Sequence, residues 1–250
     1  MGILSKLAEK ITSAGGGNTL YYPGCLTKYV SLDIEKNYQE IFRKAGIDFI
    51  QVKELEQCCG SPVYSAGYTS DFRNLIAKNL QIFKEHGVTR IITNCPACFK
   101  VFAKDYPENS KEWNIRAEHA TVVIWNAIKS GKLKVKKCFS EDITYHDPCH
   151  LGRHCGIYEE PREILKALGF TVKEMRNCRE EAFCCGGGGG LKTNQPEISN
   201  KVAEMRIKQA EETGVKKIVT TCPLCYHQLK ENCRGMEVYE LSEVLVKCLQ

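Results

Sequence analysis

The chain has no long hydrophobic run, since none of its apolar stretches approaches the roughly 20 residues that a membrane-spanning helix needs. Its first residues, MGILSKLAEKITSAGGG, carry charged and polar side chains where a secretion signal has an apolar core. The formal net charge is only +5 for 250 residues, and the lysines are scattered along the sequence. Because the apolar core of a secretion signal is missing, we do not expect export. Because nucleic-acid-binding proteins usually show a clustered basic face, we do not expect nucleic-acid binding either.

Cysteine, by contrast, is abundant, with 15 residues. Secreted proteins use many cysteines as a disulfide scaffold, but such chains are short and rich in loops. This sequence has long helical patterns and no export signal, so we expect a cytoplasmic protein, held at most at the inner face of the membrane through a complex. In a reducing compartment, clustered cysteines usually indicate metal binding or redox chemistry.

The cysteine motifs occur twice. The sequence CCG at residues 58–60 recurs at 184–186, 126 residues later, and CPAC at 95–98 recurs as CPLC at 222–225, 127 residues later. YYPGC at 21–25 matches YHDPC at 145–149, at an offset of 124. The nearly constant offset indicates a tandem duplication. We therefore expect an N-terminal helix or tail at 1–17, a first module at 18–135 and a second module at 136–250.

Each half shows the same alternation of strands and helices. Short apolar strands are expected at 18–23, 47–52 and 89–94, and again at 142–147, 170–175 and 216–221. Amphipathic helices are expected at 31–46, 69–87, 159–169 and 197–214. This alternation is typical of βαβ units and a parallel sheet. The predicted fold is α/β, with two Rossmann-like modules, each a small, mostly parallel sheet flanked by helices, related by pseudo-twofold symmetry.

Five cysteines in each half follow strands of the predicted sheet. Because the carboxyl ends of parallel strands share one edge, where open α/β folds place their sites, we expect these cysteines to meet there. The first thiol set is Cys25, Cys58, Cys59, Cys95 and Cys98, and the second is Cys149, Cys184, Cys185, Cys222 and Cys225.

Five converging thiols leave three interpretations open. Zinc takes four ligands, so a structural zinc site would leave one cysteine of each set unused. A thioredoxin-like dithiol explains each CxxC, but neither the adjacent pair nor the repeat. An iron–sulfur cluster explains the pair, because two adjacent thiolates can bind different irons of one compact cluster. The glycine behind each pair would let the backbone pass close to the inorganic core.

The two C…CCG…CxxC patterns and the segment YHDPCHLGRHCGIYEEPREIL at 145–165 resemble the CCG cysteine-rich domains found in the B and D subunits of heterodisulfide reductase. The resemblance extends from about residue 20 to the end of the chain. It implies that each thiol set binds a noncubane 4Fe–4S cluster, with all ten cysteines as iron ligands. It also implies an oxidoreductase subunit that reduces a disulfide of the CoM–S–S–CoB type with two electrons, or runs the reverse reaction.

Two other functions remain open beside this one. The same module occurs in iron–sulfur subunits linked to lactate, glycolate and glycerol-3-phosphate oxidation, so the chain could relay electrons from a flavin dehydrogenase to a quinone or another carrier. The third possibility is a zinc-binding interaction module without turnover, and zinc in one half only is also compatible with the cysteine pattern.

Partner subunits are expected because the sequence has no bacterial-ferredoxin run of the form CxxCxxCxxxCP. Cubane clusters would therefore belong to a ferredoxin-like subunit, and a flavoprotein subunit is the other expected partner. We expect the N-terminal apolar stripe of Ile3, Leu4, Leu7 and Ile11 to be a frayed helix, and membrane contact would come through a partner or, alternatively, through this stripe.

Three histidines, His146, His150 and His154, lie near Cys149 in the sequence. They could serve only in packing and capping, or one of them could donate a proton to a leaving thiolate, since imidazole titrates near neutral pH. His150 and His154 are the first candidates for such a catalytic role. Arg153 could hold the negative charge of a cluster or of a substrate carboxylate, or it could serve in capping or in an ordinary salt bridge.

Two further features of the second half need an interpretation. Cys155 is either an incidental thiol or an extra one near the second set. The run of glycines at 186–190 differs from a phosphate-binding loop, because Leu191 interrupts the required Gly-Lys-Ser/Thr ending. We expect this loop to pack around a cluster.

Overall fold

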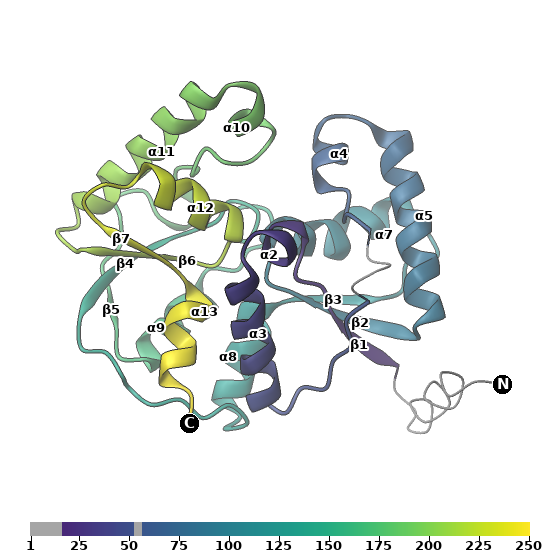
Figure 1. The fold of residues 1–250 in the computed structure, drawn as a ribbon, viewed down its shortest axis with the longest axis horizontal. Coiled ribbons are helices and arrows are strands. Elements are labelled where there is room, and N and C mark those ends of the chain that lie inside the picture. Colours follow the sequence, from purple (N-terminus) through teal and green to yellow (C-terminus); the bar gives the residue numbers. More distant parts are fainter. Residues whose placement is uncertain (1–16, 53–56) are drawn as a thin grey trace.

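The computed structural model describes residues 17–52 and 57–250. The predicted N-terminal helix or tail at 1–17, with its apolar stripe, therefore lies outside the described residues except for Gly17. The described chain forms two parallel β-sheets that lie side by side, each with helices on both faces (Figure 1). This is the α/β architecture that the alternating sequence pattern predicts.

The first half contains a three-stranded sheet of order β1-β2-β3, with all strands parallel. A single parallel bridge from Leu20 to Ile50 adds one more backbone segment outside β1. Its elements are β1 (Asn18–Tyr21), α2 (Cys25–Tyr29), α3 (Leu32–Lys44), α4 (Ser61–Ser65), α5 (Thr69–Glu85), β2 (Val88–Thr93), α6 (Pro96–Lys100), the π-helical turn η1 (Val101–Asp105), α7 (Tyr106–Asn109), β3 (Arg116–His119) and α8 (Ala120–Lys129).

The second half contains a four-stranded parallel sheet of order β5-β4-β6-β7. Its elements are β4 (Asp142–His146), α9 (Glu159–Ala167), β5 (Thr171–Val172), the 3-10 turn η2 (Arg179–Glu181), α10 (Leu191–Asn194), α11 (Pro196–Glu211), β6 (Lys217–Thr220), α12 (Pro223–Asn232), β7 (Glu237–Glu240), α13 (Leu241–Leu245) and the 3-10 turn η3 (Val246–Cys248). The Ile50 segment of the first sheet takes the place of β5, so the two halves share one topology and the predicted duplication is confirmed.

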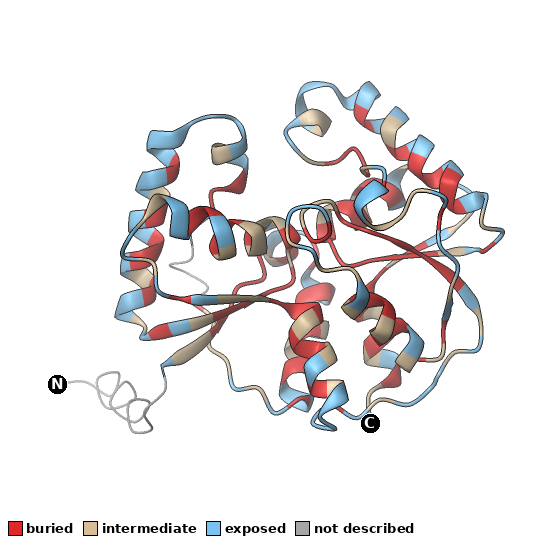
Figure 2. Cartoon of the chain, turned by 180° about the vertical axis from the view of Figure 1, so that it is seen from behind, coloured by how far each residue is buried: buried red, intermediate tan, exposed pale blue. Residues whose placement is uncertain are grey.

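Successive strand residues point to opposite faces of the first sheet. Leu20 and Ile91 pack into an outer core with side chains of α5, whereas their neighbours Tyr21 and Ile92 pack into an inner core with α3 and α8. Helix α3 covers the inner face because its apolar residues recur at helical spacing: Ile34, Tyr38, Ile41 and Phe42 are all buried. Figure 2 shows that buried residues follow the strands and one side of each long helix.

The two halves meet through their inner helices, where α3 packs against α13 and α8 packs against α9. Helix α9 is the counterpart of α3, and α13 is the counterpart of α8. The same contact is thus made twice with the halves exchanged, as a twofold axis requires. Tyr38 donates a hydrogen bond of 2.7 Å to Glu240 across this interface. One inner core is shared by both halves, so neither half buries its inner face alone.

The four predicted long helices and most predicted strands are present, with ends that differ by at most three residues. The segment 47–52 is not a regular strand, because only Ile50 forms a bridge there, and the strand expected at 170–175 shrinks to Thr171–Val172. The last strand and helix of each half, β3–α8 and β7–α13, were not predicted. Strand β3 has the sequence RAEH, whose charged residues hide it from a search for apolar runs.

Candidate functional site

Each lone cysteine and each CxxC motif follows a strand directly. Cys25 begins α2 just after β1, and Cys95 caps α6 just after β2. Cys222 caps α12 just after β6 in the same way. A proline follows Cys95 and Cys222 at the first helical position, where its missing N–H costs no hydrogen bond. The strands therefore deliver these thiols to the carboxyl edge of each sheet.

The structure brings the first thiol set together. Cys98 Sγ donates to Cys59 Sγ at 3.3 Å, and Cys98 is also hydrogen-bonded to Cys95. Cys58 is hydrogen-bonded to Cys59, and Cys25 interacts electrostatically with Cys95 and Cys59. The side chains of Cys59 and Cys98 are buried, whereas Cys25 and Cys58 are exposed to solvent.

The second thiol set is connected in a similar way. Cys184 is hydrogen-bonded to both Cys149 and Cys185. Cys225 is hydrogen-bonded to both Cys185 and Cys222. The predicted meeting of all five cysteines at one sheet edge is thus observed in each half. Cys185, Cys222 and Cys225 are buried, and Cys149 and Cys184 are half-buried, so this set is less open to solvent than the first.

Within each set, hydrogen bonds between neighbouring thiols lower the pKa of one cysteine and raise that of its partner. A hydrogen bond from Cys58 lowers the pKa of Cys59, and one from Cys98 lowers the pKa of Cys95. In the second set, the hydrogen bond from Cys149 lowers the pKa of Cys184. Each set therefore favours thiolates held next to thiols. Thiolate is the form of cysteine that binds metal.

The glycine of each CCG motif has a backbone role. Gly60 and Gly186 have positive φ angles of 86° and 84°. A Cβ on Gly60 would lie 2.7 Å from the ring of Phe72, and one on Gly186 would lie 2.5 Å from the carbonyl oxygen of Ser199. The turn and the packing behind it therefore require glycine at both positions.

A different glycine lies against the thiols. Gly24 precedes Cys25, and a Cβ on it would lie 3.1 Å from Cys98 Sγ and 3.3 Å from Cys95 Cβ. Gly24 could not be recognised from the repeat, because the second half has Pro148 at the corresponding position.

Backbone amides also point at the sulfurs. The amide of Gly60 donates to Cys58 Sγ, and the amide of Gly186 donates to Cys184 Sγ, both at 3.4 Å. The amide of Gly187 donates to Cys185 Sγ at 3.5 Å. Hydrogen bonds to sulfur stabilise the thiolate form. This first part of the glycine run thus lies against the second thiol set.

The polar groups behind the two thiol sets differ. In the first half, Asn79 on α5 donates to the carbonyl oxygen of Cys58 and to the hydroxyl of Tyr106. In the second half, Arg206 on α11 occupies the corresponding position and donates to His146. Asn79, Tyr106 and Arg206 were not among the residues predicted for the site, because none of them belongs to a motif. Only the offset of 127 residues, which aligns Asn79 with Arg206, could have drawn attention to them.

Two of the three candidate histidines lie beside Cys149. His150 is half-buried, and its Nδ1 lies 3.5 Å from Cys149 Sγ. His154 is exposed, and its ring centre lies 5.1 Å from that of His150. Desolvation lowers the pKa of both imidazoles. The pair forms a short path from a thiol of the second set to solvent.

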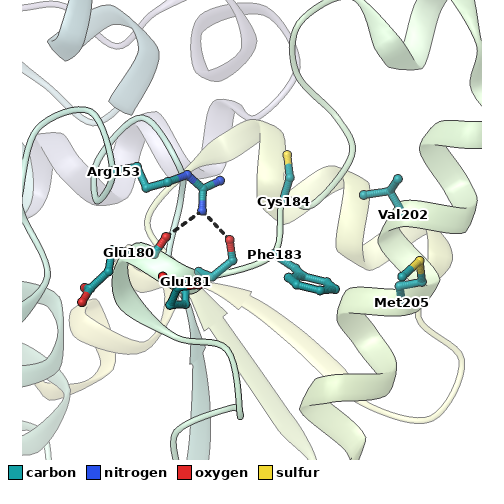
Figure 3. A pocket seen from close by; sticks show the side chains of 8 residues that line it. Arg153, Glu180, Glu181, Phe183, Cys184, Val202 and Met205 are labelled. Atoms are coloured by element: carbon teal, nitrogen blue, oxygen red, sulfur yellow. Dashed lines mark hydrogen bonds between the residues drawn. The ribbon is translucent and has the colours of Figure 1, made fainter.

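Arg153 lies at the rim of an open cavity of ≈ 420 Å³ next to Cys184 (Figure 3). Its guanidinium donates to the backbone carbonyl oxygens of Glu180 and Ala182, so it fixes the segment that leads into the second CCG motif. Phe183 and Met205 give the cavity an apolar wall. Of the roles that the sequence left open for Arg153, the observed one is hydrogen bonding to backbone carbonyls, as in capping.

Cys155 is half-buried, and burial raises the pKa of its thiol. The charged groups that act on it are Lys104, Lys100 and Asp105 of the first half. Its electrostatic neighbours therefore belong to the other half of the molecule.

Within the described parts of the chain, no helix is long and apolar enough to cross a membrane.

The chain is similar in sequence to known reductase and oxidoreductase proteins. The chain is 33% identical over 251 residues to the D subunit of the dihydromethanophenazine:CoB–CoM heterodisulfide reductase from Methanosarcina acetivorans, covering 98% of this chain and 60% of that protein. It is 31% identical to the EtfAB:quinone oxidoreductase of Syntrophomonas wolfei, covering 92% of this chain and 34% of that protein. The chain thus spans about three fifths of the heterodisulfide reductase subunits it matches.

Among solved structures, the aspartate racemase of Picrophilus torridus aligns with a TM-score of 0.41 and 10% identity, over 92% of this chain and 91% of that chain. Likeness at this level supports no statement about activity. The CCG cysteine-rich domain family, however, matches residues 19–103 and 143–230, one match in each half. Both matches contain all five cysteines of their half, as the resemblance read from the sequence predicted, and the chain belongs to the CCG cysteine-rich domain family.

Proposed function

We propose that each thiol set binds a noncubane 4Fe–4S cluster and that the chain is the disulfide-reducing subunit of an iron–sulfur oxidoreductase. The observation that carries this proposal is the convergence of five cysteines at the same sheet edge in both halves. The donor set consists of sulfur alone in the first half, and thiolates are the ligands that iron–sulfur clusters prefer. A four-ligand zinc site would again leave one converged thiol of each set unused.

The residues that would hold the clusters are the ten cysteines of the two sets. A bound cluster would supply single electrons and a site for substrate sulfur. Gly60 and Gly186 shape the turns that present the adjacent pairs, and their amides donate to sulfur. Gly24 leaves the space beside Cys98 free of a side chain. The three glycines therefore position the cysteine sulfurs and take no part in proton transfer.

Proton transfer falls to the histidines beside Cys149. Reduction of a disulfide breaks one S–S bond, consumes two electrons and leaves two thiolates, each of which takes a proton. His150 lies 3.5 Å from Cys149 Sγ, near enough to hold a proton for a thiolate leaving there. His154 is exposed and would return a proton from solvent to His150. The two electrons come from a partner subunit, either ferredoxin-like or flavin-containing.

The second candidate is electron relay without disulfide chemistry. It is favoured by the similarity to the EtfAB:quinone oxidoreductase, which has almost the same identity as the heterodisulfide reductase subunits. In such a role the ten cysteines would bind the same clusters, and a flavoprotein would deliver electrons bound for a quinone. The histidines beside Cys149 would then have only a packing role.

The first experiment is anaerobic reconstitution of the chain, followed by analysis of iron, acid-labile sulfide and zinc. We expect about eight irons and eight sulfides per chain, four for each set. About one zinc per half without sulfide would overturn the cluster proposal and favour an interaction module.

The second experiment separates disulfide reduction from relay. Protein reduced with a viologen dye is mixed with a heterodisulfide, and the thiols formed are counted. We expect two thiols for every two electrons consumed, and His150→Gln should slow thiol formation without lowering the iron content. Protein that holds both clusters but releases no thiol would instead support relay, which an assay with a quinone acceptor would then test.

A further inference from the structure

The second thiol set contains a histidine whose counterpart in the first half is a tyrosine. His146 ends β4, is 1% exposed and aligns with Tyr22 at the offset of 124. A nitrogen of its ring and the Sγ atoms of Cys185 and Cys225 all lie within 4.8 Å of one another. A histidine and two cysteines at such distances look like part of a zinc site. The position of the hydrogen on the imidazole decides whether His146 can be a ligand.

Arg206 fixes that hydrogen. Its Nε donates to His146 Nδ1 at 3.0 Å. A guanidinium has donors only, so Nδ1 must accept and carries no hydrogen. A second cation beside this buried guanidinium would be unfavourable, so the ring is neutral and its hydrogen is on Nε2. Nε2 is buried and has no hydrogen-bond partner among the described residues.

A metal-binding histidine has the opposite arrangement. It turns a lone pair towards the metal, while its other nitrogen donates to a carbonyl or a carboxylate. In this structure the other nitrogen accepts from Arg206, and Nε2 is left with an N–H. His146, which has a ring nitrogen within 4.8 Å of both Sγ atoms, is therefore left with an unused N–H donor, and it is not arranged to bind a metal.

Arg206 itself places a positive charge behind the second thiol set. It is 0% exposed, and its Nη1 donates to the Asn177 carbonyl at 2.7 Å and to Gln209 Oε1 at 2.8 Å. Its Nη2 is buried without a partner among the described residues. All three hydrogen-bond acceptors of the guanidinium are uncharged. A buried cation of this kind is stabilised by any negative charge that develops nearby.

The first half lacks both groups at the corresponding positions. Tyr22 donates its hydroxyl to the carbonyl of Gln57, and Asn79 donates to Cys58 and Tyr106. An amide and a phenol replace a guanidinium and an imidazole. The positive charge that lies behind the second thiol set is therefore missing at this place in the first.

We propose that His146 and Arg206 make the second thiol set the electron-accepting end of the chain. The Nε2–H donates to a sulfur of the bound cluster or of its cysteine ligands, and the guanidinium supports it from behind. This inference rests on the proposed function, in which both sets hold clusters. Reduction adds negative charge, and hydrogen bonds to sulfur raise the reduction potential by stabilising the reduced form. An electron that enters the chain then settles on the second cluster in preference to the first.

The test is a redox titration of the full, reconstituted chain, followed by electron paramagnetic resonance. We expect two separate one-electron steps, with the upper step belonging to the second cluster. His146→Leu should lower the reduction potential of the upper step by at least 59 mV. For one electron, this is a tenfold change in the equilibrium constant for reduction. His146→Gln, whose amide can still donate, should restore part of the shift. The matched control Tyr22→Phe should leave the upper step in place.

Different results would overturn different claims. An upper step that does not move in His146→Leu, or a lower step that moves in its place, would contradict the role of His146 while the iron and sulfide content still supported the clusters. A wild-type chain without iron and sulfide would instead remove the proposed function.

If His146→Leu fails to assemble its second cluster, the role of His146 can still be tested by a spectroscopic measurement on wild-type protein. Pulsed resonance with nitrogen-15-labelled histidine should show a weak coupling that is absent from His146→Gln. The strong coupling of an iron-bound nitrogen, or no coupling that depends on His146, would overturn the donor role.

Discussion

The two thiol sets have the same sulfur atoms at the same sheet edge, but different polar groups surround them. The first set is backed by Asn79 and Tyr106, which are neutral and hydrogen-bonded to each other. The second is backed by His146 and the buried guanidinium of Arg206. The repeat has thus kept the cysteine positions while the polar groups behind them have diverged. Duplicated ligands therefore need not give duplicated sites.

The largest effect should come from removing one buried thiol of either set. Cys59→Ser and Cys185→Ser are each expected to lose about half of the iron and sulfide, because each disrupts one set and leaves the other intact. Both should abolish disulfide cleavage if the two clusters act together. Cys138→Ser, outside both sets, is the matched control and should keep the full iron content. Equal loss in all three variants would contradict the assignment of the sets.

A buried ion pair distinguishes the second half from the first. Arg162 and Asp147 are each 2% exposed and form two hydrogen bonds of 2.7 and 2.9 Å, whereas the first half has Pro23 at the position of Asp147. Arg162→Met leaves the buried Asp147 carboxylate without its cation and with only the hydrogen bond from the Arg179 backbone amide, which should lower the free energy of unfolding by about 3–5 kcal/mol.

Denaturant unfolding measures the effect of Arg162→Met. Lys84→Met, which breaks an ion pair on the surface of the first half, is the control and should leave the midpoint unchanged. A midpoint for Arg162→Met that matched the control would show that water reaches Asp147 and solvates it.

The cysteine sets could be predicted from the sequence, but their surroundings could not. A strand followed directly by cysteine is a local pattern, and the offset repeats it, so convergence follows from the geometry of a parallel sheet. Arg206 lies in a helix rich in charged residues and reads as a solvent-exposed side chain. Its burial depends on Asn177 and His146, which are distant in sequence. Strand β3 was missed because its position beside β2, rather than its own composition, makes it a strand.

The helices α8 and α13 offer a comparison in pH dependence, because their first residues differ. Each follows the last strand of its half, and the cap is His119 in α8 and Glu240 in α13. Both side chains are 0% exposed. Burial lowers the pKa of His119 to about 3 and raises the pKa of Glu240 to about 7.

The two caps should change stability in opposite directions. The folded state binds fewer protons at His119 than the unfolded state does, so its contribution to stability is lost as the pH falls from 6.5 towards 3. The folded state binds more protons at Glu240, so its contribution is lost as the pH rises from 4.5 to about 7. For Glu240 the change across this window is on the order of 3 kcal/mol.

Unfolding measured between pH 4 and 8 for Glu240→Gln and His119→Asn tests these signs. Glu240→Gln should flatten the decline at the upper end, and His119→Asn should flatten the decline at the lower end. If the Glu240→Gln curve runs parallel to that of the wild type, Glu240 does not titrate in this window.

The smallest effects should separate backbone strain from crowding at the two CCG motifs. Gly60, Gly186 and Gly67 all have positive φ angles, of 86°, 84° and 87°, but a Cβ on Gly67 would meet nothing within 4 Å. Gly67→Ala should therefore show only the backbone cost, about 1 kcal/mol. Gly60→Ala adds a contact with a side-chain ring, and Gly186→Ala adds a closer one with the Ser199 carbonyl of α11, which cannot rotate away. Denaturant unfolding of the metal-free chains should rank the losses with Gly186→Ala largest and Gly67→Ala smallest. Equal losses at all three positions would mean that the turn conformation alone, and not the packing behind it, requires glycine after each pair of cysteines.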